Sequence, residues 1–383
     1  MAVPIPYEIL RLAWWLLLGL VLIGFAVMDG FDLGVAILLP FVARGDVERR
    51  VVINSIGPVW DGNQVWLILG GGAAFAAFPP LYAAAFSGFY IPLLLVLAAL
   101  ILRPVGFDFR NKVASPVWRL GWDVALFLGG LVPTLVFGVA IGNLLLGVPF
   151  RLSEELRPIY TGGALFDLLT PFPLLVGLVS LAMLVMHGAA YLGLKTEGAV
   201  ERRSRLAVYG GAAAVIVLFS LAGWLVATAI DGYAVVAAPP HDAPSNPLTK
   251  EVVLRAGAWL ENYRIHPWMI AGPALGYAGS LAAAGFTVLG RRGLAFLGSA
   301  AAVFGIVSTA GLSLFPFLLP SRDVPSDSLT LWDASSSQLT LFIMLVATVV
   351  VLPIVASYTV FVYRTLRGKV TAGHIERHGQ SMY

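Results

Sequence analysis

Residues 12–42 read LAWWLLLGLVLIGFAVMDGFDLGVAILLPFV, an apolar run long enough to cross a bilayer that nevertheless carries Asp29 and Asp32. The next apolar segment opens with SIGPVWDGNQVWLILGGG at residues 55–72 and carries Asp61 near its start. A charged side chain at the bilayer centre costs about 2.5–3.5 kcal/mol on insertion scales. Three such groups in the first two apolar segments therefore indicate a use, which is proton conduction, ion binding or buried pairing.

The composition is that of a polytopic helical membrane protein. Of 383 residues, 59% are hydrophobic and 12% are charged, and the mean hydropathy is +0.87. Soluble domains usually carry about 25% charged residues, and a transmembrane β-barrel would show alternating segments of about ten residues instead of long apolar runs. The sequence has no cysteine, which excludes disulfides, thiolate metal sites and cysteine nucleophiles. We expect the first apolar run to be retained, because it is too long for a signal peptide and lacks a small-residue cleavage site.

The fold class predicted from these runs is an all-α integral membrane protein with nine spans in one polytopic domain, residues 1–383. The predicted spans are 8–40, 57–77, 80–102, 120–146, 164–193, 206–230, 265–289, 293–318 and 336–363. Pro79 and Pro80 predict a tight turn between the second and third spans, because two adjacent prolines cannot both continue a helix. Two four-helix bundles plus one peripheral helix would accommodate nine spans.

The basic residues predict which side of the membrane each loop faces. If the loops alternate, most of the 24 lysines and arginines fall on the side that holds Arg49, Arg110 and Arg203. The positive-inside rule makes that side cytoplasmic. The N-terminus is then expected to be periplasmic, residues 231–264 form the largest periplasmic loop, and residues 364–383 form a cytoplasmic tail.

This topology places the three aspartates in the cytoplasmic third of the membrane. Asp29 and Asp32 lie about eight to eleven residues before their span ends, at ~1.5 Å per residue, and they share a helix face. Asp61 lies just after the next span begins, so the geometry favours a polar inlet from the cytoplasm. The alternatives are structural: Asp61 could cap its helix by accepting from the N–H of Gln64, and Asp29 could pair with a basic residue of a neighbouring span.

Two further carboxylates lie near the same side of the membrane. Asp123 falls early in the fourth predicted span. Asp108 falls in RPVGFDFR, between Arg103 and Arg110, where we expect a loop carboxylate held by the flanking arginines. Both are weaker candidates for a proton pathway than Asp61, Asp29 and Asp32.

Helix-start chemistry accounts for two other aspartates. Asp46, in GDVERRVVINSI, is a plausible N-cap of a helix that lies at the membrane interface. Asp333 precedes three serines, Ser335 to Ser337, and is expected at the start of the ninth span.

Histidine is too scarce for a haem protein of the usual kind. Of five histidines, only His187 falls inside a predicted span. A bis-histidine haem needs two well-placed ligands, which this chain does not supply. A haem held by His187 with Met183 or Met186 stays open, although a hydrogen-bonded histidine within a helix is the ordinary case. The sequence also shows no metal-ligand spacing and no nucleophile elbow, so we expect no metal site.

Specific blocks of sequence resemble a known family. MDGFDLG at residues 28–34, WDGNQVWL at 60–67, RPVGFDFR at 103–110 and SLTLWDASSSQLTL at 328–341 occur in order, with shorter stretches such as GNLLLGVPF and FPFLLPS between them. Together they extend from residue 9 to about residue 341. The chain resembles subunit II of the cytochrome bd quinol oxidase, the partner subunit that lacks haem.

The resemblance implies a quinol:oxygen oxidoreductase of the bacterial inner membrane that reduces dioxygen to water. Haem b and haem d would lie in the larger subunit I, and this chain would not be catalytic alone. Some family members also hold a quinone as a structural element of this subunit, so a structural ubiquinone is one cofactor to consider. The implied partners are subunit I, quinol and membrane lipid; small single-helix accessory subunits are left open, and nucleic acid is not expected.

The resemblance also assigns roles to the aspartates. Protons for oxygen reduction are drawn from the cytoplasm, and the smaller subunit contributes to the inlet. Asp61, the acid of the WDGNQVW block, is the residue carried over with most weight, and Asp29 and Asp32 lie at the inlet.

Two other classes of function are compatible with intramembrane carboxylates. A proton- or cation-coupled secondary transporter would use them as well, but it calls for broken helices near the midplane and inverted repeats, and neither is clear in this sequence. An inert scaffold would only stabilise its partner, and each aspartate could then be replaced without loss of turnover.

Overall fold

The computed structural model describes residues 3–162 and 165–378, and this part of the chain is mainly helical. The helices are α1 (Tyr7–Met28), α2 (Gly30–Val42), α3 (Asp46–Ile56), α4 (Trp60–Ala77), α5 (Pro79–Gly88), α6 (Tyr90–Phe109), α7 (Pro116–Leu146), α8 (Pro171–Lys195), α9 (Gly198–Thr228), α10 (Glu261–Ile265), α11 (Ala271–Val288), α12 (Arg292–Leu314), α13 (Gln338–Thr365) and α14 (Ala372–His378). The strands are β1 (Phe150–Leu152), β2 (Pro158–Tyr160), β3 (Asp231–Ala237), β4 (Glu251–Ala256), β5 (Phe317–Leu319) and β6 (Leu329–Thr330).

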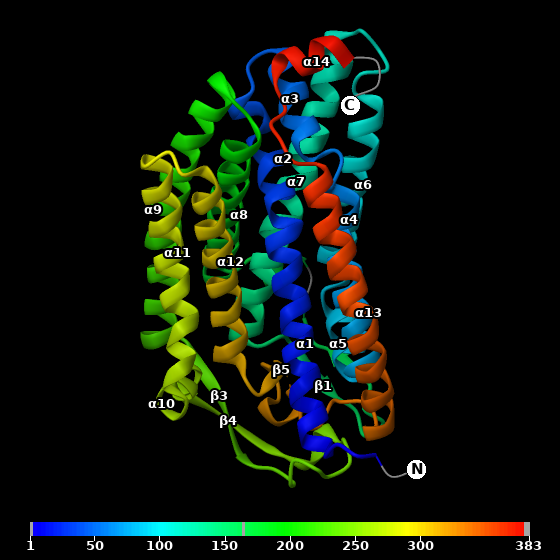
Figure 1. The fold of residues 1–383 in the computed structure, drawn as a ribbon. Helices are drawn as coiled ribbons and strands as arrows, with labels where there is room; N and C mark the ends of the chain where they lie inside the picture. Colours follow the sequence, from blue (N-terminus) through cyan, green and yellow to red (C-terminus); the bar gives the residue numbers. More distant parts are fainter. Residues whose placement is uncertain (1–2, 163–164, 379–383) are drawn as a thin grey trace.

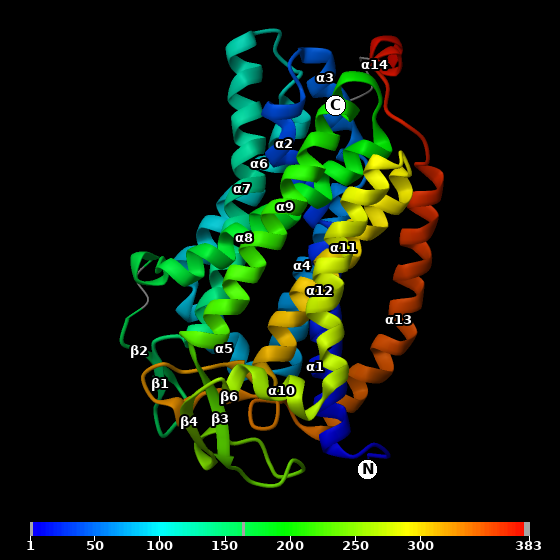
Figure 2. The ribbon, with the colours of Figure 1, turned by 90° about the vertical axis from the view of Figure 1, so that its left-hand side faces the viewer.

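The long helices run roughly parallel to one axis of an elongated molecule (Figures 1 and 2). The strands and the start of α1 gather at one end, which we call the hairpin end, whereas α3 and α14 lie at the other, the α14 end. Helices α8, α9, α11 and α12 pack against one another, and α2 lies between α7 and α8. Helix α13 runs along α1 and α4 at the edge, with 6% of its most apolar stretch buried.

Helices α1 and α2 form one continuous rod through Asp29. The Asp29 N–H donates to the Phe25 carbonyl at 2.9 Å, and the Leu33 N–H donates to the Asp29 carbonyl at 3.0 Å. The rod spans Tyr7–Val42 and is largely apolar; its charged residues are Glu8 and Arg11 in its first two turns and the two aspartates further along. The aspartates therefore lie inside a regular helix and not in a loop.

Small residues let α2 pack directly against its neighbours. A Cβ added to Gly34 would lie 1.9 Å from the Leu184 carbonyl oxygen of α8, and one added to Gly188 would lie 2.5 Å from the Gly34 carbonyl carbon. On the other side, a Cβ on Gly130 of α7 would lie 2.6 Å from the Leu33 carbonyl oxygen. Such backbone contact between helices is the role of small residues in membrane interiors.

Each predicted span coincides in outline with helix in the described residues, with one correction; residue 164, the predicted start of the fifth span, lies outside the described residues, and α8 begins at Pro171. The third span is two helices, α5 and α6, which break at Phe89, and α6 continues to Phe109. Arg103, expected beyond the end of that span, therefore lies within α6. The break at Phe78 before Pro79 is confirmed, and the two prolines begin α5, where a missing N–H costs nothing.

Eight helical segments in the described part of the chain are long and apolar enough to cross a membrane. Helix α4 is not among them, because its first turn carries Asp61, Asn63 and Gln64 and lowers its mean hydropathy. The multi-pass membrane class is thus supported, while the count of nine spans stays a prediction.

The hairpin end contains strands that the sequence did not predict. Three two-stranded antiparallel sheets form there, β1–β2, β3–β4 and β5–β6. The predicted outer loop at 231–264 contains the β3–β4 hairpin, with Asp231 opposite Ala256, followed by the short helix α10. The loop is therefore an ordered cover over this end of the helices.

Arg11 fastens that cover to α1. Its fully buried guanidinium donates to the carbonyls of His241 at 2.6 Å and Ala243 at 3.0 Å, and to the hydroxyls of Ser245 and Ser335, both at 2.8 Å. These bonds replace the hydration that the buried charge has lost.

We expect Gly34→Ala to destabilise the protein by about 1–3 kcal/mol, because the new methyl group overlaps the α8 backbone. The measurement is the thermal midpoint of the purified protein. Gly19→Ala on α1 is the matched control, since nothing lies within 4 Å of its Cβ position. Equal midpoints for the two variants would contradict the close α2–α8 contact.

Candidate functional site

A buried acid site, which consists of Asp29, Asp32, Asn63, Arg103 and Tyr363, lies where α2, α4, α6 and α13 meet. Both Asp29 oxygens accept from Arg103, at 2.8 and 3.0 Å, and both side chains are fully buried. This is the bidentate fork that matches a guanidinium to a carboxylate. The alternative that Asp29 pairs with a basic residue of a neighbouring span is therefore the arrangement in the structure.

Asp32 lies one turn further along the same rod and is also fully buried. Its Oδ2 accepts from the Asn63 side-chain amide at 2.7 Å. Its Oδ1 has no hydrogen-bond partner among the described residues, and the same holds for Nε of Arg103. Because buried polar atoms are normally satisfied, these two atoms stand out: Oδ1 of Asp32 is an acceptor without a donor, and the Nε–H of Arg103 is a donor without an acceptor.

Asp61 points the other way from Asn63. The two residues are two positions apart in the first turn of α4, which places them on different sides of the helix: Asn63 is buried and Asp61 is exposed. No side-chain bond caps α4, whose N-cap is Val59, so the capping interpretation of Asp61 is wrong.

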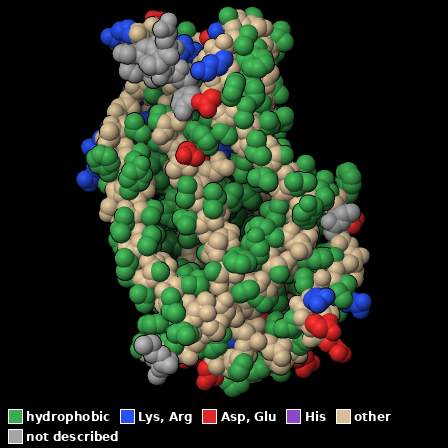
Figure 3. Space-filling model, turned by 90° about the vertical axis from the view of Figure 1, so that its right-hand side faces the viewer, with side chains coloured by type: hydrophobic (Ala, Val, Ile, Leu, Met, Phe, Trp, Pro, Cys, Tyr) green, Lys and Arg blue, Asp and Glu red, His purple; other side chains and the backbone are tan. Residues whose placement is uncertain are grey.

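Asp61 lines a groove between α4 and α6. The groove has a volume of about 180 Å³, and its other walls come mainly from apolar side chains, among them Val65, Ile68, Leu97 and Ile101. Figure 3 shows the face that carries α13, α4 and α6, which is largely apolar and hollowed in the middle. An exposed carboxylate on such a face, near the buried acids, is unusual for a side chain that only faces lipid.

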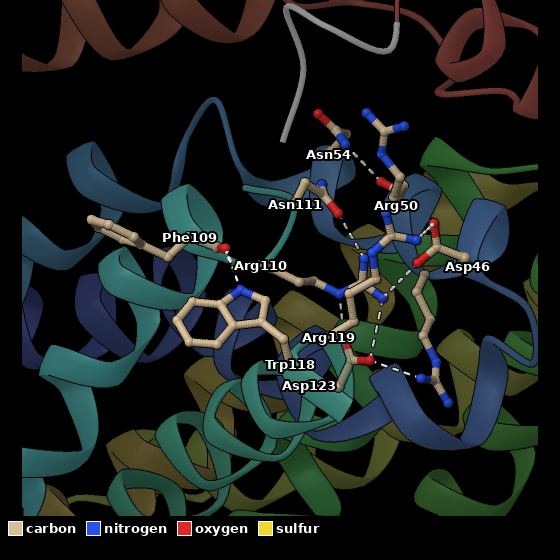
Figure 4. A network of polar contacts seen from close by, with 10 residues as sticks. Asp46, Arg50, Asn54, Phe109, Arg110, Asn111, Trp118, Arg119 and Asp123 are labelled. Carbon is tan, nitrogen blue, oxygen red and sulfur yellow. Dashed lines mark hydrogen bonds and ion pairs between the residues drawn. The ribbon is translucent and has the colours of Figure 1, made fainter. Parts of the chain in front are cut away.

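Asp123 belongs to a separate ion-pair cluster at the α14 end (Figure 4). Arg110 lies between Asp123 of α7, at 2.6 Å, and Asp46 of α3, at 3.1 Å. Asp123 also accepts from Arg49 at 2.8 Å, and Asp46 from Arg119 at 3.1 Å. Asp46 stands in the first turn of α3 after its N-cap Gly45, so it ties α3 to the α6–α7 turn instead of capping the helix.

The prediction that Asp108 is a loop carboxylate held by its two flanking arginines is wrong. Arg103 is committed to Asp29, and Arg110 is committed to Asp123 and Asp46. Asp108 lies on the exposed side of the last turn of α6, away from both arginines that flank it in sequence. Residues two and five positions apart on a helix do not share a face, which is why sequence proximity misled here.

Another ion pair, between Arg203 and Glu48, also lies at the α14 end, outside the predicted spans. Arg203 of α9 donates to the Glu48 carboxylate at 2.8 Å and to the Val42 carbonyl at 2.6 Å. The hydrogen bond from Arg203 holds the pKa of Glu48 below its ordinary value. Glu48 is therefore ionised at neutral pH, and its stabilising contribution is lost only as the pH falls through that lowered pKa.

His187 is engaged on both ring nitrogens. Nδ1 lies 2.8 Å from the Ser299 hydroxyl and Nε2 lies 2.9 Å from the Val27 carbonyl, while the ring stacks on Phe296. The residue joins α8 to α1 and α12, which is the hydrogen-bonded role expected for it. Among the side chains that the structure describes, no three His, Asp or Glu residues lie close enough together to hold a metal ion. The side chains of His374 and His378 are not among those described.

Asp333 does not start α13. Ser337 is the N-cap of that helix and accepts from the Thr340 N–H, so the serine run supplies the cap as expected. Asp333 instead binds Thr330 at 2.6 Å and Lys250 at 3.1 Å. It fastens the end of the β5–β6 hairpin to the outer loop.

The sequence missed three members of the buried acid site. The sequence places Arg103 just beyond the end of a predicted span, and it gives Asn63 no role although this residue stands two positions from Asp61. Its polarity at the start of a span was the signal that could have found it. Tyr363 carried no signal of its own, because 300 residues separate it from Asn63.

Comparison with known proteins now identifies the family. Residues 10–366 match the family described as cytochrome bd terminal oxidase subunit II. The chain belongs to this family. It is subunit II of a cytochrome bd-type quinol oxidase, and hence a component of an oxidoreductase of the respiratory chain.

Individual relatives are similar in sequence to this chain over nearly its whole length. This subunit II is 51% identical over 379 residues to cytochrome bd-I ubiquinol oxidase subunit 2 of Escherichia coli K12, covering 99% of this chain and 100% of the relative. It is 49% identical over 380 residues to the probable cytochrome oxidase subunit 2 of Haemophilus influenzae, covering 99% and 100%. A solved chain of the bd oxidase from Geobacillus thermodenitrificans has the same fold, with a TM-score of 0.63, 17% identity, and coverage of 93% and 98%.

We expect Arg103→Met to cost about 3–5 kcal/mol, because it leaves the Asp29 carboxylate buried without its partner. Removing both charges in the double variant Asp29→Leu with Arg103→Met should recover most of that loss. The measurement is the thermal midpoint and yield of the assembled complex. Arg119→Met, which removes a half-exposed ion pair, is the control, and a midpoint for Arg103→Met equal to that of the control would refute the assignment.

Proposed function

We propose that this subunit forms the cytoplasmic proton inlet of the oxidase, beside its role of supporting the haem-bearing subunit I. The observation that carries the proposal is Asp61, a carboxylate exposed on an apolar face at the start of α4, in the same helical turn as the buried Asn63 that binds Asp32. Proton routes through membranes use such chains of acids and polar groups.

The proposed route has two parts. Asp61 takes up a proton at the α14 end and passes it across the face of α4 and α6 to acidic groups of subunit I. The buried acid site keeps the start of α4 polar: Arg103 neutralises Asp29, and Asp32 retains an oxygen that can bind a proton or water. Asp123 and Asp108 take no direct part in this route, since Asp123 is held by two arginines and Asp108 lies apart.

The route requires that the α14 end is cytoplasmic. We propose nine spans, with a periplasmic N-terminus and a cytoplasmic C-terminal segment. The span that adds to the eight apolar helical segments is α4, whose mean hydropathy is low because its first turn is polar. Helix α1 begins at one end of the molecule and α14 lies at the other, which agrees with an odd number of crossings (Figure 1). The arginines of α3, α9 and the α6–α7 turn gather at the α14 end, as the positive-inside rule expects.

The apolar face around the Asp61 groove is also where we expect the partner subunit to bind. We propose that subunit I, with haem b and haem d, covers the face of α4, α6 and α13, in the inner membrane of a bacterium. Ile68, Leu97 and Ile101 are 70%, 56% and 54% exposed there and surround the Asp61 groove. Covering them would enclose Asp61 between the two subunits and shield the proton route from lipid.

The partner is tested by a reduced-minus-oxidised optical spectrum of the purified protein. Bands of haem d and haem b that travel with a second, larger polypeptide are the expected result. A colourless, stable preparation of this chain alone would contradict the assembly.

The inlet is tested with Asp61→Asn. The variant should assemble with all its haems but consume oxygen about a hundredfold more slowly, because a positioned group that transfers protons typically contributes about a hundredfold or more. Asp231→Asn is the control, since that exposed carboxylate lies at the hairpin end. Full oxygen consumption by assembled Asp61→Asn would leave only a scaffolding role.

A further inference from the structure

Tyr363 reaches the buried acid site from a helix that otherwise stays apart from it. Its hydroxyl donates to Oδ1 of Asn63 at 2.8 Å, and Nδ2 of Asn63 donates to Oδ2 of Asp32 at 2.7 Å. Asn63 is 2% exposed and Asp32 is 0% exposed, so the bond between them is shielded from solvent, while the Tyr363 bond at the outer end of the chain is part-buried. The edge helix α13 is thus linked to a buried carboxyl group through one amide.

The Tyr363 bond is not required to keep α13 in place. At the α14 end, Nζ of Lys195 donates to the Leu366 carbonyl at 2.8 Å, and the Val370 N–H donates to the Lys195 carbonyl at 2.8 Å. At the hairpin end, Nε1 of Trp14 donates to the Leu341 carbonyl at 2.9 Å. Because both ends are fastened elsewhere, loss of the phenol hydroxyl should leave the fold intact.

The amide of Asn63 can bond to Oδ2 of Asp32 whether that oxygen is ionised or protonated, in opposite orientations. When Asp32 is ionised, it accepts from the amide N–H, and the amide oxygen accepts from Tyr363, as in the structure. When the proton is on Oδ2, that O–H needs an acceptor, so the amide turns over and gives its N–H to the phenol oxygen; a proton on Oδ1 leaves the bond from Asn63 to Oδ2 as it is. A tyrosine hydroxyl fits both arrangements, since it both donates and accepts.

The other groups that face Asp32 do not change roles in this way. Asp29 and Arg103 occupy each other, and Tyr191 of α8, which is close enough to Asp32 to interact electrostatically, donates its hydroxyl to the Ser55 carbonyl at 2.8 Å. The bond from Asn63 is therefore the polar contact on Asp32 that a neighbour can adjust.

We propose that Tyr363 is a positioning residue for Asp32, which acts through the Asn63 amide to hold Asp32 ready to exchange a proton. The inference rests on the proposed inlet and deepens it by adding a residue of α13. With its oxygen bonded to the phenol, the amide is a stronger donor to ionised Asp32. Without the phenol, the ionised form loses support.

The test uses the assembled oxidase with Tyr363→Phe. The pH dependence of oxygen consumption should move to higher pH by about half a unit, which is what losing part of one hydrogen bond gives. The KM for quinol should not change. Tyr358→Phe on the same helix is the control, because Tyr358 is 68% exposed and has no hydrogen-bond partner among the described residues.

A spectroscopic readout and a double variant separate positioning from a general structural effect. The infrared carbonyl band of protonated Asp32, identified by its loss in Asp32→Asn, should shift in Tyr363→Phe and not in Tyr358→Phe. Asn63→Leu should move the pH profile in the same direction, and combining it with Tyr363→Phe should add nothing, because both break one chain of bonds.

Each outcome is decisive. If Asp32→Asn slows turnover while Tyr363→Phe leaves the band and the pH profile unchanged, the inference fails and the inlet stands. Additive shifts in the double variant would also overturn it, since Tyr363 would then act independently of Asn63. If neither Asp61→Asn nor Asp32→Asn affects turnover, the proposed inlet itself fails.

Discussion

The bidentate pair between Asp29 and Arg103 is the constraint around which this subunit is organised. Neither charge is exposed, so each requires the other, and together they hold the rod of α1 and α2 in register with α6. The pair neutralises two of the three charges in the buried acid site. What remains is Asp32, with one oxygen bound to Asn63 and one without a partner among the described residues.

Helix packing makes this arrangement possible. The glycines at 34, 130 and 188 let α2 approach α7 and α8 with backbone in contact, which leaves its other side to face α4 and α6. At the α14 end, the ion pairs of Asp46 and Asp123 tie α3 to the turn between α6 and α7, and the ion pair of Glu48 ties α3 to α9. Because α3 leads directly into α4, these ion pairs help to fix the start of α4.

Much of the fold could be predicted, because hydropathy is a sum over neighbouring residues. The apolar runs, the break at Phe78 and the serine cap of α13 all depend on local sequence. The strands at the hairpin end do not follow from hydropathy: β1, β2, β5 and β6 have only two or three residues each, too few for an alternating pattern, and the longer β3–β4 hairpin falls in a segment predicted as a loop. Asp108 was assigned wrongly for a related reason: the arginines beside it in sequence point elsewhere on α6.

The sequence by itself determined that this protein crosses the membrane repeatedly, which family it belongs to, and which acids lie in its first two apolar segments. Composition and motifs are properties of contiguous residues, and folding does not alter them. Only the tertiary structure decided what each acid does. Asp29 meets Arg103 across 74 residues and Asn63 meets Tyr363 across 300, and such pairings depend on helix packing that no local pattern encodes. The direction in which Asp61 and Asn63 point was likewise decided by how α4 packs.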